Sequence, residues 1–157
     1  MNGLIQRAAL AGAFEERRRA GERIVFTNGC FDLLHPGHVW LISKAAALGD
    51  RLVIAINDDA SVRRLKGRGR PIYKEQERAE ILLAVRWVDY VTVFSEDTPL
   101  ETIHLIKPHV LVKGGEYQER DIVGASFVRG LGGNVVRIPM KKGHGTRIIV
   151  GRVKDTA

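Results

Sequence analysis

Two histidines, His35 and His38, lie in the segment 27–38, which reads TNGCFDLLHPGH. Where a helix begins, side chains at this spacing share one face, so both imidazoles can face one bound group. The start of a helix also offers free backbone N–H groups and a positive dipole end, which favour phosphate. The preceding Asn28-Gly29 step permits a tight turn whose backbone can approach a ligand. The segment therefore predicts a phosphate site in which two imidazoles donate hydrogen bonds.

Three other interpretations of this segment stay open. The first makes the histidines a helix cap and a surface residue. The second makes them half of a metal site, but only Cys30 lies nearby as a further ligand, and the spacing fits zinc poorly. The third makes Cys30 a nucleophile, although no acid–base partner is evident and a thiol beside a tight turn more often packs. We predict no metal ligands from the protein itself.

A second feature is the basic run RRLKGRGR at residues 63–70, which holds five cations and no acid. It carries most of the net charge of +7, which results from 25 basic and 18 acidic residues. Such a balance suits nucleic acid, an acidic membrane surface or a phosphorylated metabolite. Because no aromatic residue interleaves to stack on bases, we favour a local phosphate site. A solvated basic loop and a nucleic-acid-binding module are the alternatives.

The elements that must position these residues follow from short apolar runs that alternate with helix-like segments. We expect strands at 23–27, 51–56, 90–94, 110–113 and 135–138, and helices at 37–48, 74–85, 99–107 and 121–131. Pro99 would lie in the first turn of its helix. Apolar strands separated by helices predict an α/β fold with a doubly wound, five-stranded parallel sheet of the Rossmann-like type. Ligands then bind beyond the carboxyl ends of the strands.

The 157 residues predict one domain, with an N-terminal amphipathic helix at 1–22 and a catalytic core at 23–150. The helix would cover the domain, or form a contact in a homo-oligomer. The single cysteine excludes a disulfide framework. No apolar run approaches the roughly 18 residues of a membrane span, and no signal peptide is evident. We expect a cytoplasmic protein without a membrane or nucleic-acid partner.

The string NGCFDLLHPGH resembles the HxGH signature of the nucleotidyltransferase superfamily, which includes cytidylyltransferases and class I aminoacyl-tRNA synthetases. Further segments are similar to those of heptose 1-phosphate adenylyltransferases, and the resemblance covers roughly residues 23–150. They are NDDASV at 57–62, RLKG at 64–67, RPI at 70–72, ERA at 77–79, VD at 88–89, DTP at 97–99 and VKGGEY at 112–117. The resemblance implies a Rossmann-like nucleotidyltransferase fold and a free-standing version of a domain that some organisms fuse to a sugar kinase.

The implied reaction is adenylyl transfer from ATP to D-glycero-β-D-manno-heptose 1-phosphate, giving ADP-heptose and pyrophosphate for the lipopolysaccharide core. His35, His38 and Lys66 would be catalytic. Mg²⁺ would accompany ATP and bridge phosphate oxygens, mostly with water ligands. The nucleotide would be bound by Thr27, Asn28, Gly29, Cys30, Phe31, Gly37, Lys113, Gly114, Glu116 and Thr146. The sugar phosphate would be bound by Asp32, Asn57, Asp58 and Arg70, although Asp32, Asn57 and Asp58 have loop capping as an alternative role.

One stretch departs from the family pattern. The family usually has a Ser-Thr-Thr type stretch at the start of a C-terminal helix that touches the triphosphate, whereas residues 139–149 read PMKKGHGTRII. Thr146 matches one threonine, and the serine position falls on His144 or Gly145. Arg147 or Lys142 would then supply charge in place of the hydroxyl groups. The runner-up is a cytidylyltransferase for glycerol 3-phosphate or a similar alcohol phosphate. KGGEY at 113–117 and the lack of arginine in 139–143 favour the adenylyl version.

Overall fold

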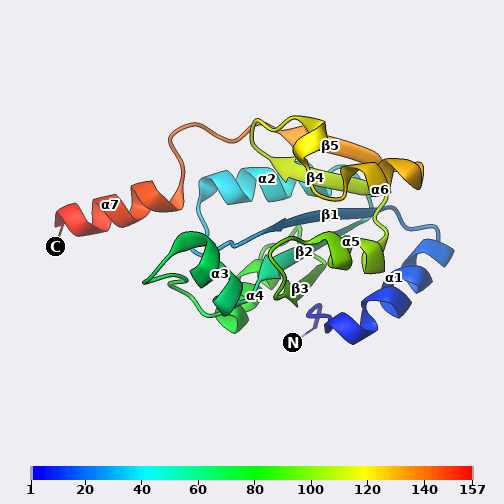
Figure 1. The fold of residues 1–157 in the computed structure, drawn as a ribbon, viewed down its shortest axis with the longest axis horizontal. Helices are drawn as coiled ribbons and strands as arrows, with labels where there is room; N and C mark the ends of the chain where they lie inside the picture. The colour runs from blue at the N-terminus through cyan, green and yellow to red at the C-terminus, as the bar shows by residue number, and fades with distance from the viewer. Residues whose placement is uncertain (1, 157) are drawn as a thin grey trace.

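The carboxyl ends of five parallel strands meet at one edge of a sheet in the computed structural model, which describes residues 2–156 (Figure 1). The strand order is β3-β2-β1-β4-β5, which confirms the predicted parallel sheet. The strands are β1 Ile24–Gly29, β2 Arg51–Asn57, β3 Tyr90–Phe94, β4 Val110–Gly114 and β5 Asn134–Ile138. Because the order reverses between β1 and β4, the ends of these two strands mark the expected ligand position.

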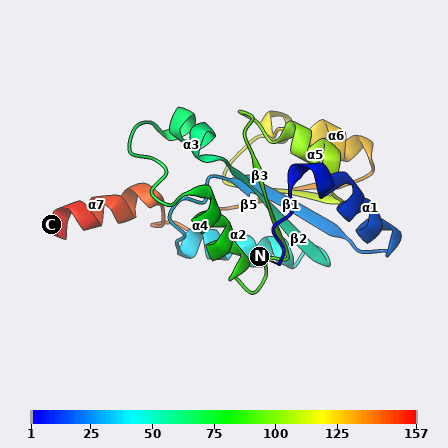
Figure 2. The same cartoon turned by 90° about the horizontal axis from the view of Figure 1, so that it is seen from below.

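Helices cover both faces of this sheet, as Figure 2 shows. The helices α2 and α4 pack on one face, and α1, α5 and α6 pack on the other. The bounds are η1 Arg7–Ala9, α1 Leu10–Arg19, α2 Pro36–Ala46, α3 Asp59–Lys66, α4 Glu75–Leu83, α5 Leu100–Ile106, η2 Glu119–Asp121, α6 Ala125–Gly130 and α7 Thr146–Thr156. Among residues 2–156, none of these helices is long and apolar enough to cross a membrane.

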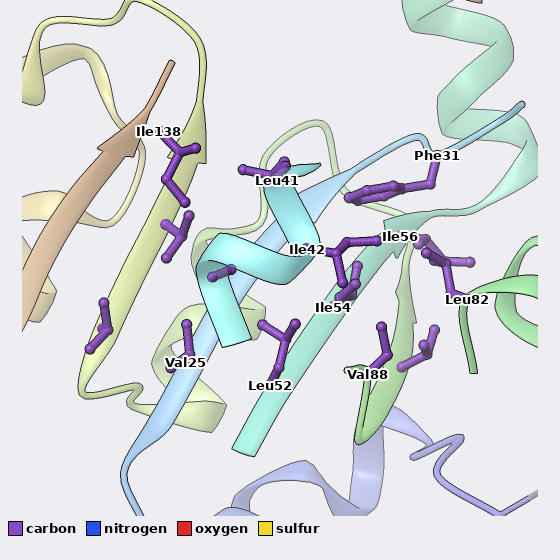
Figure 3. Packing of buried hydrophobic residues seen from close by; sticks show 14 of the residues in the cluster. Val25, Phe31, Leu41, Ile42, Leu52, Ile54, Ile56, Leu82, Val88 and Ile138 are labelled. Carbon is purple, nitrogen blue, oxygen red and sulfur yellow. The ribbon is translucent and has the colours of Figure 1, made fainter. Parts of the chain in front are cut away.

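Alternation along the strands builds the two cores. In β1, Val25 faces α2 and α4, whereas Ile24 and Phe26 face the opposite layer. Figure 3 shows Ile42 of α2 in the cluster with Ile54 of β2. Full burial of such an aliphatic side chain contributes about 1.5–3 kcal/mol. This packing fixes the start of α2 just beyond the carboxyl end of β1.

The N-terminal segment differs from the expected single helix. Leu4 forms a parallel bridge to Val91 of β3, and the helix α1 starts only at Leu10. The backbone of Ile5 donates to the carbonyl of Val91, so the first described residues extend the sheet edge. The prediction of a helix over 1–22 was therefore wrong before residue 7, because edge pairing satisfies this backbone instead. Met1 lies outside the described residues.

The boundaries of other helices and strands also differ from those predicted from the sequence. Between the strand expected at 51–56 and the helix expected at 74–85, where no helix was predicted, the chain forms α3, which ends at Gly67 with a φ of +92°. The helix expected at 121–131 is interrupted by Gly124, whose φ is +85° and where an added Cβ would lie 2.6 Å from Ile103 Cδ1. Pro99 is the N-cap of α5 rather than a first-turn residue. Strand β1 runs through Asn28 and Gly29, which pair with β2, so the turn expected there begins after Gly29.

Candidate active site

His35 caps the N-terminus of α2. Its Nδ1 accepts a hydrogen bond of 3.1 Å from the backbone N–H of Gly37, and the side chain is 6% exposed. A neutral imidazole that accepts at Nδ1 carries its proton on Nε2, which is then available to a ligand. Burial lowers the pKa of His35, and His144 lowers it further. His35 is therefore a helix cap, as one alternative expected, whereas His38 is not the surface residue of that alternative; the cap leaves one donor for phosphate.

His38 stacks on His35, with ring centroids 3.8 Å apart, and lies 5.0 Å from the ring of Phe31. Burial, and then the neighbouring His35, lower the pKa of His38 to about 4. Its Nδ1 is buried without a hydrogen-bond partner in the described part of the chain. The two imidazoles therefore offer N–H donors near neutral pH rather than two positive charges.

Two glycines of the motif make room for these rings. A Cβ on Gly29 would lie 3.1 Å from the ring of Phe31, and one on Gly37 would lie 2.8 Å from Cε1 of His35. Phe31 itself adopts a φ of +45°, which turns the chain sharply after β1. The glycines thus let the backbone of the β1–α2 connection pass close to the imidazole pair.

A cavity of about 420 Å³ opens beside His38. Lys66 from α3 and Arg70 from the following loop line it on one side, and the first turn of α7 with Arg147 lines it on the other. Its other lining residues are Cys30, Phe31, Asp32, Gly145, Thr146 and Ile148. The structure therefore brings His38, Lys66, Arg70 and Thr146 together, as the sequence predicts.

A second basic cavity adjoins the first. Lys66, Arg70 and Arg147 also line an adjoining cavity of about 400 Å³, where Lys154 of α7 joins them. Its remaining lining residues are Leu65, Val150 and Gly151, so none of the residues 2–156 that line this space is acidic. The result is a basic path that leads from His38 along α7 and suits a chain of phosphates.

Asp32 is held by the protein itself. Its carboxylate accepts from Arg70 Nη1 at 2.6 Å and from the backbone N–H groups of Ile72 and Tyr73 at 2.7 and 3.1 Å. Asp32 is 6% exposed. These bonds favour the loop-anchoring alternative for Asp32 over a contact to sugar hydroxyl groups.

The polar residues after β2 are also engaged. Asp58 caps α3 by accepting from the backbone of Ser61 at 2.6 Å, and Asn57 Nδ2 donates to the Ser61 hydroxyl at 2.9 Å. The thiol of Cys30 lies 3.7 Å from Asn57 Oδ1. Burial raises the pKa of Cys30, which keeps the thiol protonated and argues against a nucleophile.

The predicted base-binding stretch lies at the end of β4. Glu116 lines a separate cavity of about 440 Å³ together with Tyr117 and Arg137. Lys113 Nζ lies 5.5 Å from the ring centroid of Tyr117, and burial lowers its pKa. A Cβ on Gly114 would lie 2.7 Å from Met140 Sδ. This stretch and the His38 cavity thus occupy neighbouring strand ends without sharing one cavity.

Thr27 is fully buried in β1, and its Oγ1 has no hydrogen-bond partner among residues 2–156. Thr27 therefore belongs to the strand itself and precedes the segment that faces the ligand. Among the same residues, no group of three or more His, Cys, Asp or Glu side chains could hold a metal ion. The polar groups at the site are donors suited to phosphate.

Sequence reasoning assigned no role to Arg78 and none beyond alignment to His144. Arg78 is 1% exposed and donates to the carbonyls of Cys30 and Asn57, both at 2.8 Å. A signal existed, since Arg78 falls on the buried face of α4 beside Ala79. For His144, more than a hundred residues from His38, the sequence offers no comparable signal.

The parallel α/β sheet, with a stacked imidazole pair at a helix start and cations around it, agrees with the nucleotidyltransferase resemblance of the HxGH segment. The chain belongs to the cytidylyltransferase-like family, whose model matches residues 26–142.

Curated relatives agree with this membership. The chain is 52% identical over 149 residues to the bifunctional protein HldE of Syntrophotalea carbinolica, and 53% identical over 149 residues to that of Pelobacter propionicus. Each alignment covers 95% of this chain and 30% of the relative. The chain therefore spans less than a third of the length of these relatives.

Solved structures share the fold. The lipopolysaccharide core biosynthesis protein from Thermoplasma volcanium has a TM-score of 0.64 and 26% identity, covering 79% of this chain and all of that chain. A pantoate-beta-alanine ligase from Francisella tularensis has a TM-score of 0.58 and 16% identity, covering 88% and 67%. The second likeness shows the fold alone.

Proposed function

We propose that this chain transfers the adenylyl group of ATP to D-glycero-β-D-manno-heptose 1-phosphate, giving ADP-heptose and pyrophosphate. The observation that carries the proposal is the stacked imidazole pair of His35 and His38, with His38 lining a cavity that Lys66, Arg70 and Arg147 also line. The identity of about 50% to HldE proteins and the likeness to a lipopolysaccharide core biosynthesis protein support the heptose acceptor.

The reaction needs no general base. A sugar phosphate is largely ionised at neutral pH, since its second pKa is about 6. One of its oxygens attacks the α-phosphorus of ATP, and the bond from that phosphorus to the oxygen bridging the β-phosphorus breaks. The electron pair leaves with pyrophosphate, so no proton must move. Catalysis is then positioning and charge stabilisation.

Each site residue has a part in this scheme. His35 Nε2–H and the imidazole of His38 donate to oxygens of the α-phosphate as charge develops there. Lys66 and Arg147 bind the β- and γ-phosphates and then the leaving pyrophosphate. Arg70 has one Nη on Asp32 and lines the same cavity as Lys66, where it adds positive charge near the phosphates. Mg²⁺ accompanying ATP would neutralise part of the phosphate charge.

A cytidylyltransferase acting on glycerol 3-phosphate or a similar alcohol phosphate is the second candidate. It is favoured by the family description. The segment 113–117 favours adenine, because its KGGEY differs from the acidic segment expected of cytidylyl enzymes. The stretch 139–143 likewise lacks the arginine expected there in those enzymes.

The test measures pyrophosphate release with Mg²⁺, crossing ATP and CTP against heptose 1-phosphate and glycerol 3-phosphate. We expect release with ATP and heptose 1-phosphate alone, and ADP-heptose as the second product. Release with CTP and glycerol 3-phosphate would support the same type of reaction but would show that both proposed substrates are wrong. A protein silent in all four pairings would refute the proposal, provided that its far-UV circular dichroism shows it folded.

A further inference from the structure

A further cavity lies at the amino ends of the strands, at the edge of the sheet opposite the candidate active site, and its volume is about 330 Å³. Three neighbouring strands begin around it: Arg23 precedes β1, His109 precedes β4 and Asn134 opens β5. Arg18 of α1 and Lys107, the C-cap of α5, line it as well. In Figure 1, α1 lies at the opposite end of the molecule from α7, so this cavity is separate from the basic path.

The charges around this cavity do not cancel. Arg18, Arg23 and Lys107 supply three cations, whereas Glu15 is the one acidic residue among residues 2–156 that lines the space. The carboxylate of Glu15 accepts from Arg18 Nη2 at 2.7 Å and from Arg19 Nε at 3.1 Å. In the same part of the chain, no ion pair involves Arg23 or Lys107. The lining residues therefore carry a net positive charge.

Helix ends explain part of this arrangement. Arg18 Nη1 donates to the carbonyl of Ile106, the last residue of α5, and Arg23 Nε donates at 3.1 Å to the carbonyl of Leu48, just after α2. Such contacts satisfy carbonyls that a helix end leaves without a partner. The carbonyl dipoles offset only part of a full positive charge, and these contacts do not involve Lys107.

His109 adds a neutral donor to the same cavity. Its Nδ1 accepts a hydrogen bond of 3.0 Å from the backbone N–H of Ile24, so the neutral ring carries its proton on Nε2. Burial lowers the pKa of His109, Arg23 and Arg18 lower it further, and Asp50 opposes them. The imidazole therefore lies within electrostatic range of both guanidiniums. An anion beside these groups would favour their charged forms.

We propose that this cavity binds a phosphate group, either inorganic phosphate or the phosphate of a small metabolite. Ammonium, guanidinium and imidazole N–H groups are the donors that bind phosphate oxygens most strongly. The charge of a phosphate monoester near pH 7, about −1.5 to −2, balances the excess of cations. The volume is far above the roughly 30 Å³ that one water molecule takes up, so an anion of several heavy atoms fits. This site lies outside the proposed function and does not depend on it.

NMR titrations in which inorganic phosphate or glycerol 3-phosphate replaces chloride at constant ionic strength test the site. They follow the amide signals of Gly132 and Gly133, which line the cavity, and the imidazole signal of His109. Lys107→Asn removes a lining cation at a residue whose φ is +49°, a conformation that asparagine tolerates. Arg120→Asn is the matched control, because it removes an exposed cation that does not line the cavity.

We expect saturable shifts of the same affinity in wild type and Arg120→Asn, together with a higher pKa of His109 when phosphate is bound. Binding should be about tenfold weaker in Lys107→Asn and in His109→Asn, which keeps an acceptor for Ile24 but loses the Nε2 donor. Tighter binding of glycerol 3-phosphate than of phosphate would identify a phosphorylated metabolite as the ligand, and equal binding would identify the free anion.

Shifts that grow without saturation would overturn the assignment, and so would equal affinities in Lys107→Asn and Arg120→Asn. The dispersion of the amide signals in each variant establishes that the domain is folded. Failure of the proposed function would look different. The titrations involve neither a nucleotide nor the sugar phosphate, so a chain that forms no ADP-heptose could still bind phosphate in this cavity.

Discussion

The guanidinium of Arg78 donates a hydrogen bond of 2.8 Å to the backbone carbonyl of Cys30. The same side chain donates to the carbonyls of Asn57 and Tyr73 and pairs with Asp59. One residue of α4 thereby joins the segments that follow β1 and β2, which carry most of the candidate site.

Replacing Arg78 with Met should lower the free energy of unfolding by about 3 kcal/mol, because three backbone carbonyls lose their donor and Asp59 loses its partner. Urea denaturation measures this loss. Arg63→Met, at an exposed position on α3, is the matched control and should change stability by less than about 0.5 kcal/mol. If both variants were equally stable, Arg78 would not be the residue that holds the segments after β1 and β2 together.

The low pKa of His38 should make stability depend on pH. The unfolded imidazole binds a proton below about pH 6.5, whereas the folded one does so only near 4, so acid favours unfolding in this window. The stabilisation is complete above pH 6.5 and is lost as pH falls toward 4. Between pH 7 and pH 5 this one group should cost about 2 kcal/mol.

Urea denaturation of wild type and His38→Gln at both pH values isolates that contribution. The loss of stability on acidification should be about 2 kcal/mol smaller in the variant. His35 and His109, whose pKa values are also lowered by burial, would account for the remaining loss in both proteins. The same loss with and without His38 would mean that this imidazole titrates normally.

His35 has two separable roles. In His35→Asn the side-chain oxygen can still accept from Gly37 N–H, but the Nε2 donor is gone; in His35→Ala both are lost. Both variants should lower kcat/KM for adenylyl transfer by about 10²–10³. Only His35→Ala should also lose about 1 kcal/mol of stability. If His35→Asn kept full activity, His35 would act only as the helix cap.

The Asp32–Arg70 pair should anchor the loop after α3 rather than bind sugar. We expect Asp32→Asn to lower stability by about 2 kcal/mol while the KM for heptose 1-phosphate changes little. A double-mutant cycle with Arg70→Met, followed by urea denaturation, should give a coupling energy of at least about 1 kcal/mol. A large rise in that KM without loss of stability would restore the sugar-binding interpretation of Asp32.

The sequence was enough to predict all five strands, because each is an apolar run bounded by polar residues. It was also enough for the imidazole pair, since His35 and His38 owe their proximity to local helix geometry. It missed α3, whose eight residues have three cations near the end and no long apolar stripe. That helix depends on the Asp58 cap, a signal that also fits an isolated turn.

Contacts between residues far apart in the chain could not be predicted from these local sequence patterns. The bridge of Leu4 to Val91 and the position of His144 over Gly37 each join residues far apart in the chain. At Gly124, where the expected helix is split, an added Cβ would meet Ile103 of α5. Each of these features arises where two elements pack against each other. Hydrophobic periodicity, in contrast, predicts only which face of a single element is buried.

The bridge between Leu4 and Val91 has a practical consequence for handling the protein. It attaches the N-terminal segment to the amino end of β3, whereas α7 leaves from the edge of the sheet where the site lies, as Figures 1 and 2 both show. A surface or a bulky fluorophore tethered ahead of Leu4 would leave the mouth of the basic path open. The same attachment at the far end of α7 would stand beside Lys154 and crowd the entry of the nucleotide.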